Sequence, residues 1–186
     1  MTAQETEIYE GCLKQDKASQ KLLYNMYTRK MMGVCMRYTR DEYEAENILQ
    51  ESFIKIFNSI KNFQPVGSLE GWIKRIIVNT ATDYYRKMKR LKYTHDSIDE
   101  EHNQIASIDI DNFGVQAILD VMQTLPEGSR LIFNMYAIEG YTHQDIADEL
   151  GISIGTSKSQ YSRAKAILKQ KLEKLDKDFF LTKLKA

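Results

Sequence analysis

Apolar residues recur at spacings of three and four along most of the chain, and this helical period is the strongest constraint on its fold. The stretch 41–61 repeats the period behind an acidic start, which suits the positive end of a helix dipole. Only Pro65 and Pro126 interrupt 186 residues, and the sequence has no alternating strand pattern. The sequence therefore predicts an all-α protein. Between residues 5 and 36 the period is carried by Ile8, Leu13, Leu22, Leu23, Tyr27, Met31, Met32 and Cys35.

Breaks in this pattern divide the chain into two small helical domains. Pro65 and Gly67 end one helical block, and Ser68 can cap a further helix to about residue 91. Residues 92–113 lose the period and carry six acids against one base. We therefore expect a helical domain over 1–91, a flexible acidic linker over 92–113, a second helical domain over 114–175 and a charged tail over 176–186.

The stretch from residue 141 to residue 168 predicts a helix-turn-helix. Thr142 with Asp145 fits a capping box, and Gly151 fits the left-handed residue that ends a helix. Ser153 can cap the second helix, whose first turn is where base contact is expected in this motif. A plain helical hairpin with a solvated basic face is the alternative. The side chains expected to contact phosphates or base edges are Thr156, Lys158, Ser159, Gln160, Ser162 and Arg163.

The charges are unevenly distributed although the chain has 26 basic and 26 acidic side chains. Residues 1–90 carry a net charge of +4, residues 91–113 carry −5 and residues 114–186 carry +1. Within 71–92 seven bases accompany one acid, Asp83, and within 156–174 six bases accompany one acid, Glu173. Two basic helices are thus separated by an acidic segment. Because non-specific affinity follows the number of neutralised phosphates, we expect weak DNA binding unless a larger partner contributes.

Two sequence blocks resemble a known family. The blocks DEYEAENILQESFIKIFNSIKNF and GSLEGWIKRIIVNTATDYYRK are similar to the core region of bacterial sigma factors. The later block LPEGSRLIFNMYAIEGYTHQDIADELGISIGTSKSQYSRAKAIL is similar to their second domain, and the order of features resembles the extracytoplasmic function (ECF) group. The resemblance spans about residues 8–172. It implies a region 2 domain that binds core RNA polymerase and reads and melts the −10 element, and a region 4 domain that reads the −35 element.

The resemblance also implies roles for particular residues. Polymerase binding falls on the helix that holds Glu42, Glu44, Glu46, Gln50, Glu51 and Phe53. The residues that the resemblance assigns to recognition of the −10 element are Phe63, Ser68, Asn79, Asp83, Arg86, Lys87 and Arg90. Residues 63–68 match a loop that captures an unstacked base. Lys158, Ser159 and Arg163 match family positions that contact the −35 element, and we expect Thr156, Gln160 and Ser162 on the same helix to contact it as well.

Three positions stay open or depart from the family pattern. Trp72 could stack on a base, but at the start of an amphipathic helix a core anchor is the favoured interpretation. Gln160 stands where many relatives have Arg, so we expect a −35 element that is less rich in G. Ser157 stands where many relatives have Val, which predicts a modest loss of packing in the helix-turn-helix.

No feature of the sequence predicts an enzyme, a metal site, a cofactor or a small-molecule substrate. His95, His102 and His143 show no metal spacing, and Cys12 and Cys35 are expected to be buried thiols. The polar, acidic start is unlike a signal peptide, and no run of about 18 apolar residues exists, so a cytoplasmic protein without a membrane span is expected.

The expected partners are core RNA polymerase and promoter DNA, and we expect a monomer when the chain is free. An anti-sigma protein could clamp between the two domains. Two alternatives remain at this stage. One is an autonomous helix-turn-helix regulator that binds duplex DNA alone, and the other is an all-helical adaptor without a DNA role.

Overall fold

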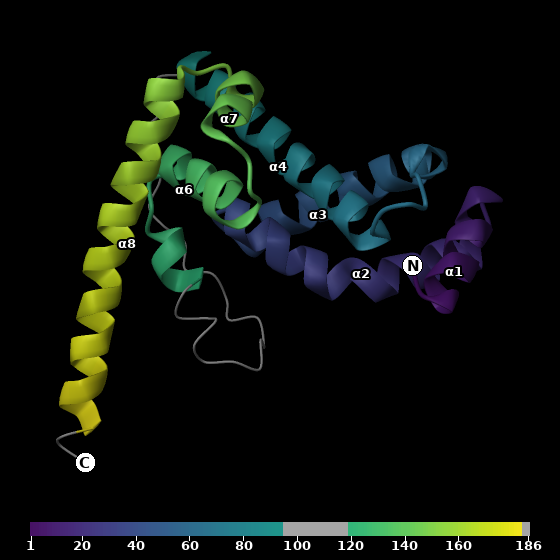
Figure 1. Cartoon of the computed structure of the whole chain (residues 1–186), viewed down its shortest axis with the longest axis horizontal. Coiled ribbons are helices and arrows are strands. Elements are labelled where there is room, and N and C mark those ends of the chain that lie inside the picture. The colour runs from purple at the N-terminus through teal and green to yellow at the C-terminus, as the bar shows by residue number, and fades with distance from the viewer. Residues whose placement is uncertain (95–118, 184–186) are drawn as a thin grey trace. The chain divides into compact units, whose positions relative to one another are not determined.

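The computed structural model describes residues 1–94 and 119–183, and within these ranges it contains helices and no strand (Figure 1). The chain divides into two compact units, Met1–Ile105 and Ala106–Ala186. The all-α prediction with two domains is therefore confirmed. Apart from residues 92–94, the expected acidic linker lies outside the described residues.

The first unit contains α1 (Ala3–Leu13), α2 (Lys17–Tyr38), α3 (Glu42–Ser59), the short η1 (Ile60–Asn62) and α4 (Leu69–Thr94). Side chains near the helix starts satisfy the free backbone N–H groups there. Thr2 forms a capping box with Glu5, Asp16 accepts from the backbone of Ser19, and Asp41 accepts from that of Glu44. These caps fix where α1, α2 and α3 begin.

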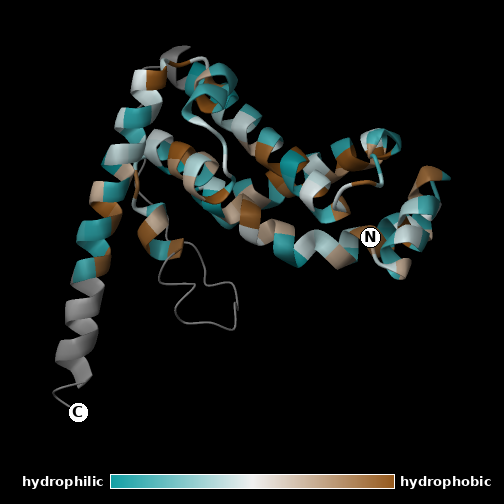
Figure 2. Cartoon of the chain, in the orientation of Figure 1, coloured by the Kyte–Doolittle hydropathy of each residue, from teal (hydrophilic) through white to brown (hydrophobic). Residues whose placement is uncertain are grey.

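The core of the first unit lies where α2, α3 and α4 pack on one another. Hydrophobic and hydrophilic residues alternate along the ribbons of these helices (Figure 2). Cys12 is 2% exposed and Cys35 is fully buried, so the prediction of buried thiols is confirmed. Burial raises the pKa of the Cys35 thiol to about 12, which keeps it protonated. Other fully buried members are Leu23, Met31, Ile56, Ile73 and Ile77.

The second unit contains a helical stretch over 119–123, α6 (Glu127–Phe133), the π-helical turn η2 (Asn134–Ile138), α7 (His143–Leu150) and α8 (Ile154–Lys183). Both α6 and α7 pack on α8, and Met135, Ile146 and Ala164 are buried there. The sequence pattern did not predict η2. Helix α8 also continues into the segment expected to be a separate tail, because no Gly or Pro after residue 155 can end it.

Adjacent leucines on α2 test this core. Leu23 is fully buried and Leu22 is 53% exposed. We expect Leu23→Ala to lower the free energy of unfolding by about 2–5 kcal/mol, because it removes core contacts and leaves a cavity. The matched control Leu22→Ala should change it by less than about 0.5 kcal/mol. Urea unfolding followed by the fluorescence of Trp72, the only tryptophan, measures the stability of this unit. Equal losses of unfolding free energy in the two variants would contradict the packing.

Candidate nucleic-acid interface

The outer face of α4 carries most of the residues assigned to the −10 element. Asn79, Asp83, Lys87 and Arg90 are exposed at spacings of three and four, and Arg86 beside them is half-buried. These positions share one face of the helix. The structure therefore brings together an amide, which can donate to and accept from a base edge, and three cations suited to phosphates.

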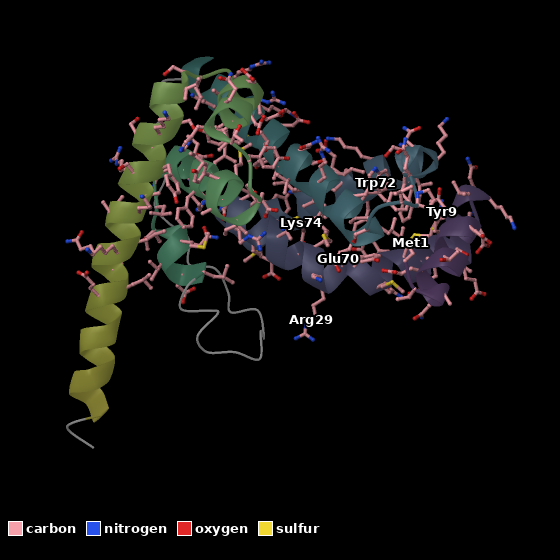
Figure 3. The ribbon with its side chains drawn as sticks, viewed as in Figure 1. Met1, Tyr9, Arg29, Glu70, Trp72 and Lys74 are labelled. Atoms are coloured by element: carbon pink, nitrogen blue, oxygen red, sulfur yellow. The ribbon has the colours of Figure 1, made fainter. Side chains whose placement is uncertain are left out.

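The other two residues assigned to the −10 element hold the loop before α4. Phe63 is 5% exposed, and its ring packs on those of Tyr9 and Trp72 with centroid distances of 5.5 and 5.6 Å. Figure 3 labels Tyr9 and Trp72. Ser68 accepts from the backbone N–H of Gly71 at 3.2 Å and caps α4. Half-buried Trp72 thus packs as the favoured core interpretation expected. Val66 at the tip of the loop is 98% exposed, and sequence reasoning did not single it out.

Helix α3 presents only part of the surface assigned to the polymerase. Glu46, Gln50 and Glu51 are exposed, and Glu42 is half-buried. Phe53 is 3% exposed and packs on Tyr24 at a centroid distance of 4.7 Å, so a partner cannot reach its ring on the folded surface.

Glu44 on α3 faces α4. Its carboxylate accepts from the Tyr84 hydroxyl at 3.1 Å and from the backbone of Arg40 at 3.0 Å. Two exposed apolar residues on α3 were missed, Tyr43 at 73% and Ile54 at 61%. They lie eleven positions apart, about three helical turns, so the helical period places them on one stripe.

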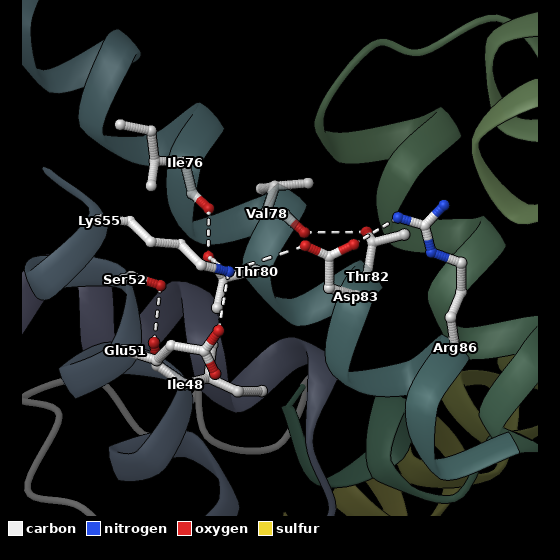
Figure 4. A network of polar contacts seen from close by, with 10 residues as sticks. All are labelled: Ile48, Glu51, Ser52, Lys55, Ile76, Val78, Thr80, Thr82, Asp83 and Arg86. Carbon is white, nitrogen blue, oxygen red and sulfur yellow. Dashed lines mark hydrogen bonds and ion pairs between the residues drawn. The ribbon is translucent and has the colours of Figure 1, made fainter. Parts of the chain in front are cut away.

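A polar network joins α3 to α4 (Figure 4). The Lys55 ammonium on α3 lies 2.8 Å from the Glu51 carboxylate, 3.3 Å from the Thr80 hydroxyl and 3.7 Å from the Asp83 carboxylate. Asp83 also pairs with Arg86 one turn further along α4. Helices α3 and α4 are thus bonded to each other through their side chains. Beside Asn79, an open hollow of about 440 Å³ lies between the two helices.

The predicted caps of the helix-turn-helix are confirmed. The Asp145 backbone donates to the Thr142 hydroxyl at 3.1 Å, and the Asp145 carboxylate accepts from the Thr142 backbone at 2.9 Å. Gly151 has a φ of 62°, the left-handed conformation that ends α7. Ser153 accepts from the Thr156 backbone at 3.0 Å and starts α8.

The start of α8 exposes five of the six residues assigned to the −35 element: Thr156, Lys158, Ser159, Ser162 and Arg163. The sixth residue, Gln160, is half-buried, and its amide oxygen accepts from the hydroxyl of fully buried Ser129 on α6. This contact ties Gln160 to the domain interior. The residues around it form the outward polar face.

Ser157 is fully buried, and its hydroxyl lies 2.9 Å from Nδ1 of His143 at the start of α7. The His143 ring stacks on Tyr136 at a centroid distance of 4.2 Å and meets the edge of Tyr161 at 5.7 Å. The hydrogen bond therefore gives the buried hydroxyl the partner that it needs. Desolvation first, and then the charge of Lys158, lower the pKa of His143.

Two family models match the chain. Sigma-70 region 2 covers residues 23–91 and Sigma-70, region 4 covers residues 115–168. The chain belongs to the sigma-70 family and is an ECF-type sigma factor. The first match includes the α3–α4 pair, and the second includes the helix-turn-helix, so the family resemblance stated from the sequence is confirmed.

Individual relatives agree with this assignment. The ECF RNA polymerase sigma-E factor of Haemophilus influenzae is 27% identical over 176 residues, covering 86% of this chain and 90% of the relative. The RNA polymerase sigma-H factor of Pseudomonas aeruginosa is 27% identical, with coverage of 92% and 95%. The sigma factor RpoE of Bartonella quintana, solved with the anti-sigma factor NepR, has a similar fold with a TM-score of 0.56 at 22% identity, covering 82% of this chain and 96% of that one.

Two further features bear on what this sigma factor can do. Among the described residues, no group of three or more His, Cys, Asp or Glu side chains could hold a metal ion. His95 and His102 lie outside the described residues. In the described part of the chain, no helix has the length and apolar character needed to cross a membrane.

The His143 contact predicts a pH dependence of stability for this sigma factor. Because the folded state lowers the pKa of His143, folding favours the neutral ring, and the unfolded chain binds the proton more readily. The stabilising contribution is therefore complete above the ordinary value of 6.5 and is lost as the pH falls below it.

We expect the Tm of the wild-type chain to fall more than that of His143→Asn between about pH 8 and about pH 5. Asn keeps a polar partner for Ser157 but does not titrate in this range. Circular dichroism melts of both full chains measure the difference. If the Tm of the two chains changes equally with pH, His143 is not the cause of the pH dependence.

Proposed function

We propose that this ECF sigma factor binds core RNA polymerase through the exposed face of α3, reads and melts the −10 element with α4, and reads the −35 element with the start of α8. The observation that carries the proposal is the α3–α4 pair. One helix exposes acids and apolar residues, and the other exposes an amide and cations on one face. A surface for a protein and a surface for DNA thus lie on neighbouring helices.

The proposed polymerase surface consists of Glu42, Glu46, Gln50 and Glu51 together with Tyr43 and Ile54. Exposed apolar side chains flanked by carboxylates suit a partner whose apolar contact is rimmed by cations. We propose that Glu44 and Phe53 support this surface and do not contact the polymerase. Glu44 bonds α3 to α4, and Phe53 packs in the core.

At the −10 element we propose that Asn79 contacts a base and that Arg86, Lys87 and Arg90 contact phosphates. Phe63 and Ser68 shape the loop 63–68 through packing and capping. At the −35 element we propose contacts from Thr156, Lys158, Ser159, Ser162 and Arg163. Gln160 supports this face through the hydrogen bond that its amide oxygen accepts from Ser129.

The autonomous regulator is not favoured, because the Sigma-70 region 2 match covers α3 and all of α4 except its last three residues, and such a regulator does not need this helix pair. We further propose a non-enzymatic factor that acts in the cytoplasm, where the polymerase works, and that is a monomer when free. Because the Bartonella quintana factor was solved with an anti-sigma factor, we propose that a protein of that kind also holds this chain. Purification of the chain from its host without such a protein would count against that partner.

The proposed function is tested by transcription in vitro from a library of fragments randomised at the −35 and −10 positions. We expect core polymerase with the chain to give transcripts that core polymerase alone does not give. The recovered fragments should share one sequence at each element. Absence of transcripts, together with tight binding of the chain alone to duplex DNA, would favour the autonomous regulator.

A variant links the result to α4. Asn79→Ala should lower transcription from a recovered promoter about tenfold, because a bidentate amide–base contact contributes roughly 1–3 kcal/mol. The variant should also lose preference at one −10 position. Asn25→Ala, an exposed asparagine on α2, is the matched control and should leave both unchanged. If the two substitutions have equal effects, Asn79 does not read a base.

A further inference from the structure

Asp83 is an acid in an otherwise basic segment. Residues 71–92 contain seven basic side chains and Asp83 as the one acid. Its side chain is 52% exposed, and it lies on the same face of α4 as Asn79 and Lys87. An unneutralised carboxylate at this place would repel the phosphates that the neighbouring cations attract.

Lys55 brings a cation to this carboxylate from a different helix. Its ammonium lies 3.7 Å from Asp83 and 3.3 Å from the hydroxyl of Thr80, a residue that is 1% exposed. Glu51 holds the same ammonium at 2.8 Å from one turn earlier on α3. Glu at i and Lys at i+4 is the favourable order along a helix. The ammonium is therefore fixed at the edge where α3 meets α4.

Arg86 is the second cation on Asp83, and it donates to the other carboxylate oxygen. A carboxylate with two cationic neighbours carries little net field toward DNA. With Lys55 removed, Asp83 would depend on Arg86 alone, and the cation nearest to it would be less available to a phosphate. The charges Glu51, Lys55, Asp83 and Arg86 alternate in sign from one helix to the other (Figure 4).

We propose that Lys55 is a positioning residue for promoter opening, which neutralises and orients Asp83 so that the face of α4 accepts the −10 strand. The proposal rests on the proposed function of α4. Lys55 acts through Asp83 and makes no contact with DNA of its own. The effect of losing Lys55 should therefore disappear when the carboxylate is also removed.

The test uses the full chain assembled with core polymerase and a promoter fragment recovered from the randomised library. The measurement is the equilibrium fraction of open promoter, from permanganate reactivity of unpaired thymines. Lys55→Met should lower the ratio of open to closed promoter about two- to fivefold at low salt, the range of an exposed charge pair. Adding Asp83→Asn to Lys55→Met should restore this ratio. The loss caused by Lys55→Met should also shrink as salt rises, because added ions screen the repulsion.

Two controls separate this role from folding and from polymerase binding. Lys21→Met removes one exposed lysine from α2 of the same unit and should leave promoter opening unchanged. Urea unfolding followed by Trp72 fluorescence and titration of each variant with core polymerase should show wild-type behaviour for Lys55→Met. If Lys55→Met lowers stability or affinity for core polymerase enough to account for its loss of promoter opening, the proposal is wrong.

The double variant decides between the remaining explanations. If Lys55→Met with Asp83→Asn stays as impaired as Lys55→Met, Lys55 binds DNA itself and the proposal is wrong. If Asp83→Asn alone is as harmful as Lys55→Met, Asp83 reads the promoter and the proposal is also wrong. Failure of the proposed function is distinguishable, because the wild-type holoenzyme would then open no fragment from the library.

Discussion

The packing of α3 on α4 is the contact on which the rest of the first unit depends. Both helices bury apolar side chains in the core of the unit, among them Ile48, Ile56, Ile73 and Ile77, each at most 1% exposed. Because the inner faces are fixed by this core, the outer faces are fixed as well, one acidic and apolar and the other mainly basic. The Glu44–Tyr84 hydrogen bond and the Lys55 contacts then set the side chains along the seam. The surfaces that we propose for polymerase binding and for promoter opening therefore lie on neighbouring helices.

In the second unit, helix caps and a buried hydrogen bond fix the position of the start of α8. Thr142, Gly151 and Ser153 fix where α7 ends and α8 begins. His143 supplies the partner for the hydroxyl of Ser157, which offsets the apolar area that Ser lacks relative to Val. The exposed donors of α8 therefore start from a fixed turn, so their spacing is set before DNA binds.

Features that depend on residues near in sequence were predictable, and features that depend on distant contacts were not. The caps, the helix-turn-helix and the buried cysteines follow from residue type and helical period. A family pattern assigns roles to positions but does not say which side of the helix faces the core, so Phe53 and Phe63 were expected at surfaces although both are buried. The bond between Gln160 and Ser129 joins positions 31 residues apart, and no local pattern predicts it.

Zero net charge is compatible with reading DNA because the charges are segregated along the chain, and the polymerase would supply affinity that neither basic helix provides alone. The most direct test of this account is site-specific photo-cross-linking in the holoenzyme–promoter complex, with the cross-linker placed at position 87 or at position 162. The account predicts cross-links to the −10 element from position 87 and to the −35 element from position 162, both dependent on core polymerase. Cross-links from both positions to a single duplex site, formed by the chain alone, would contradict it.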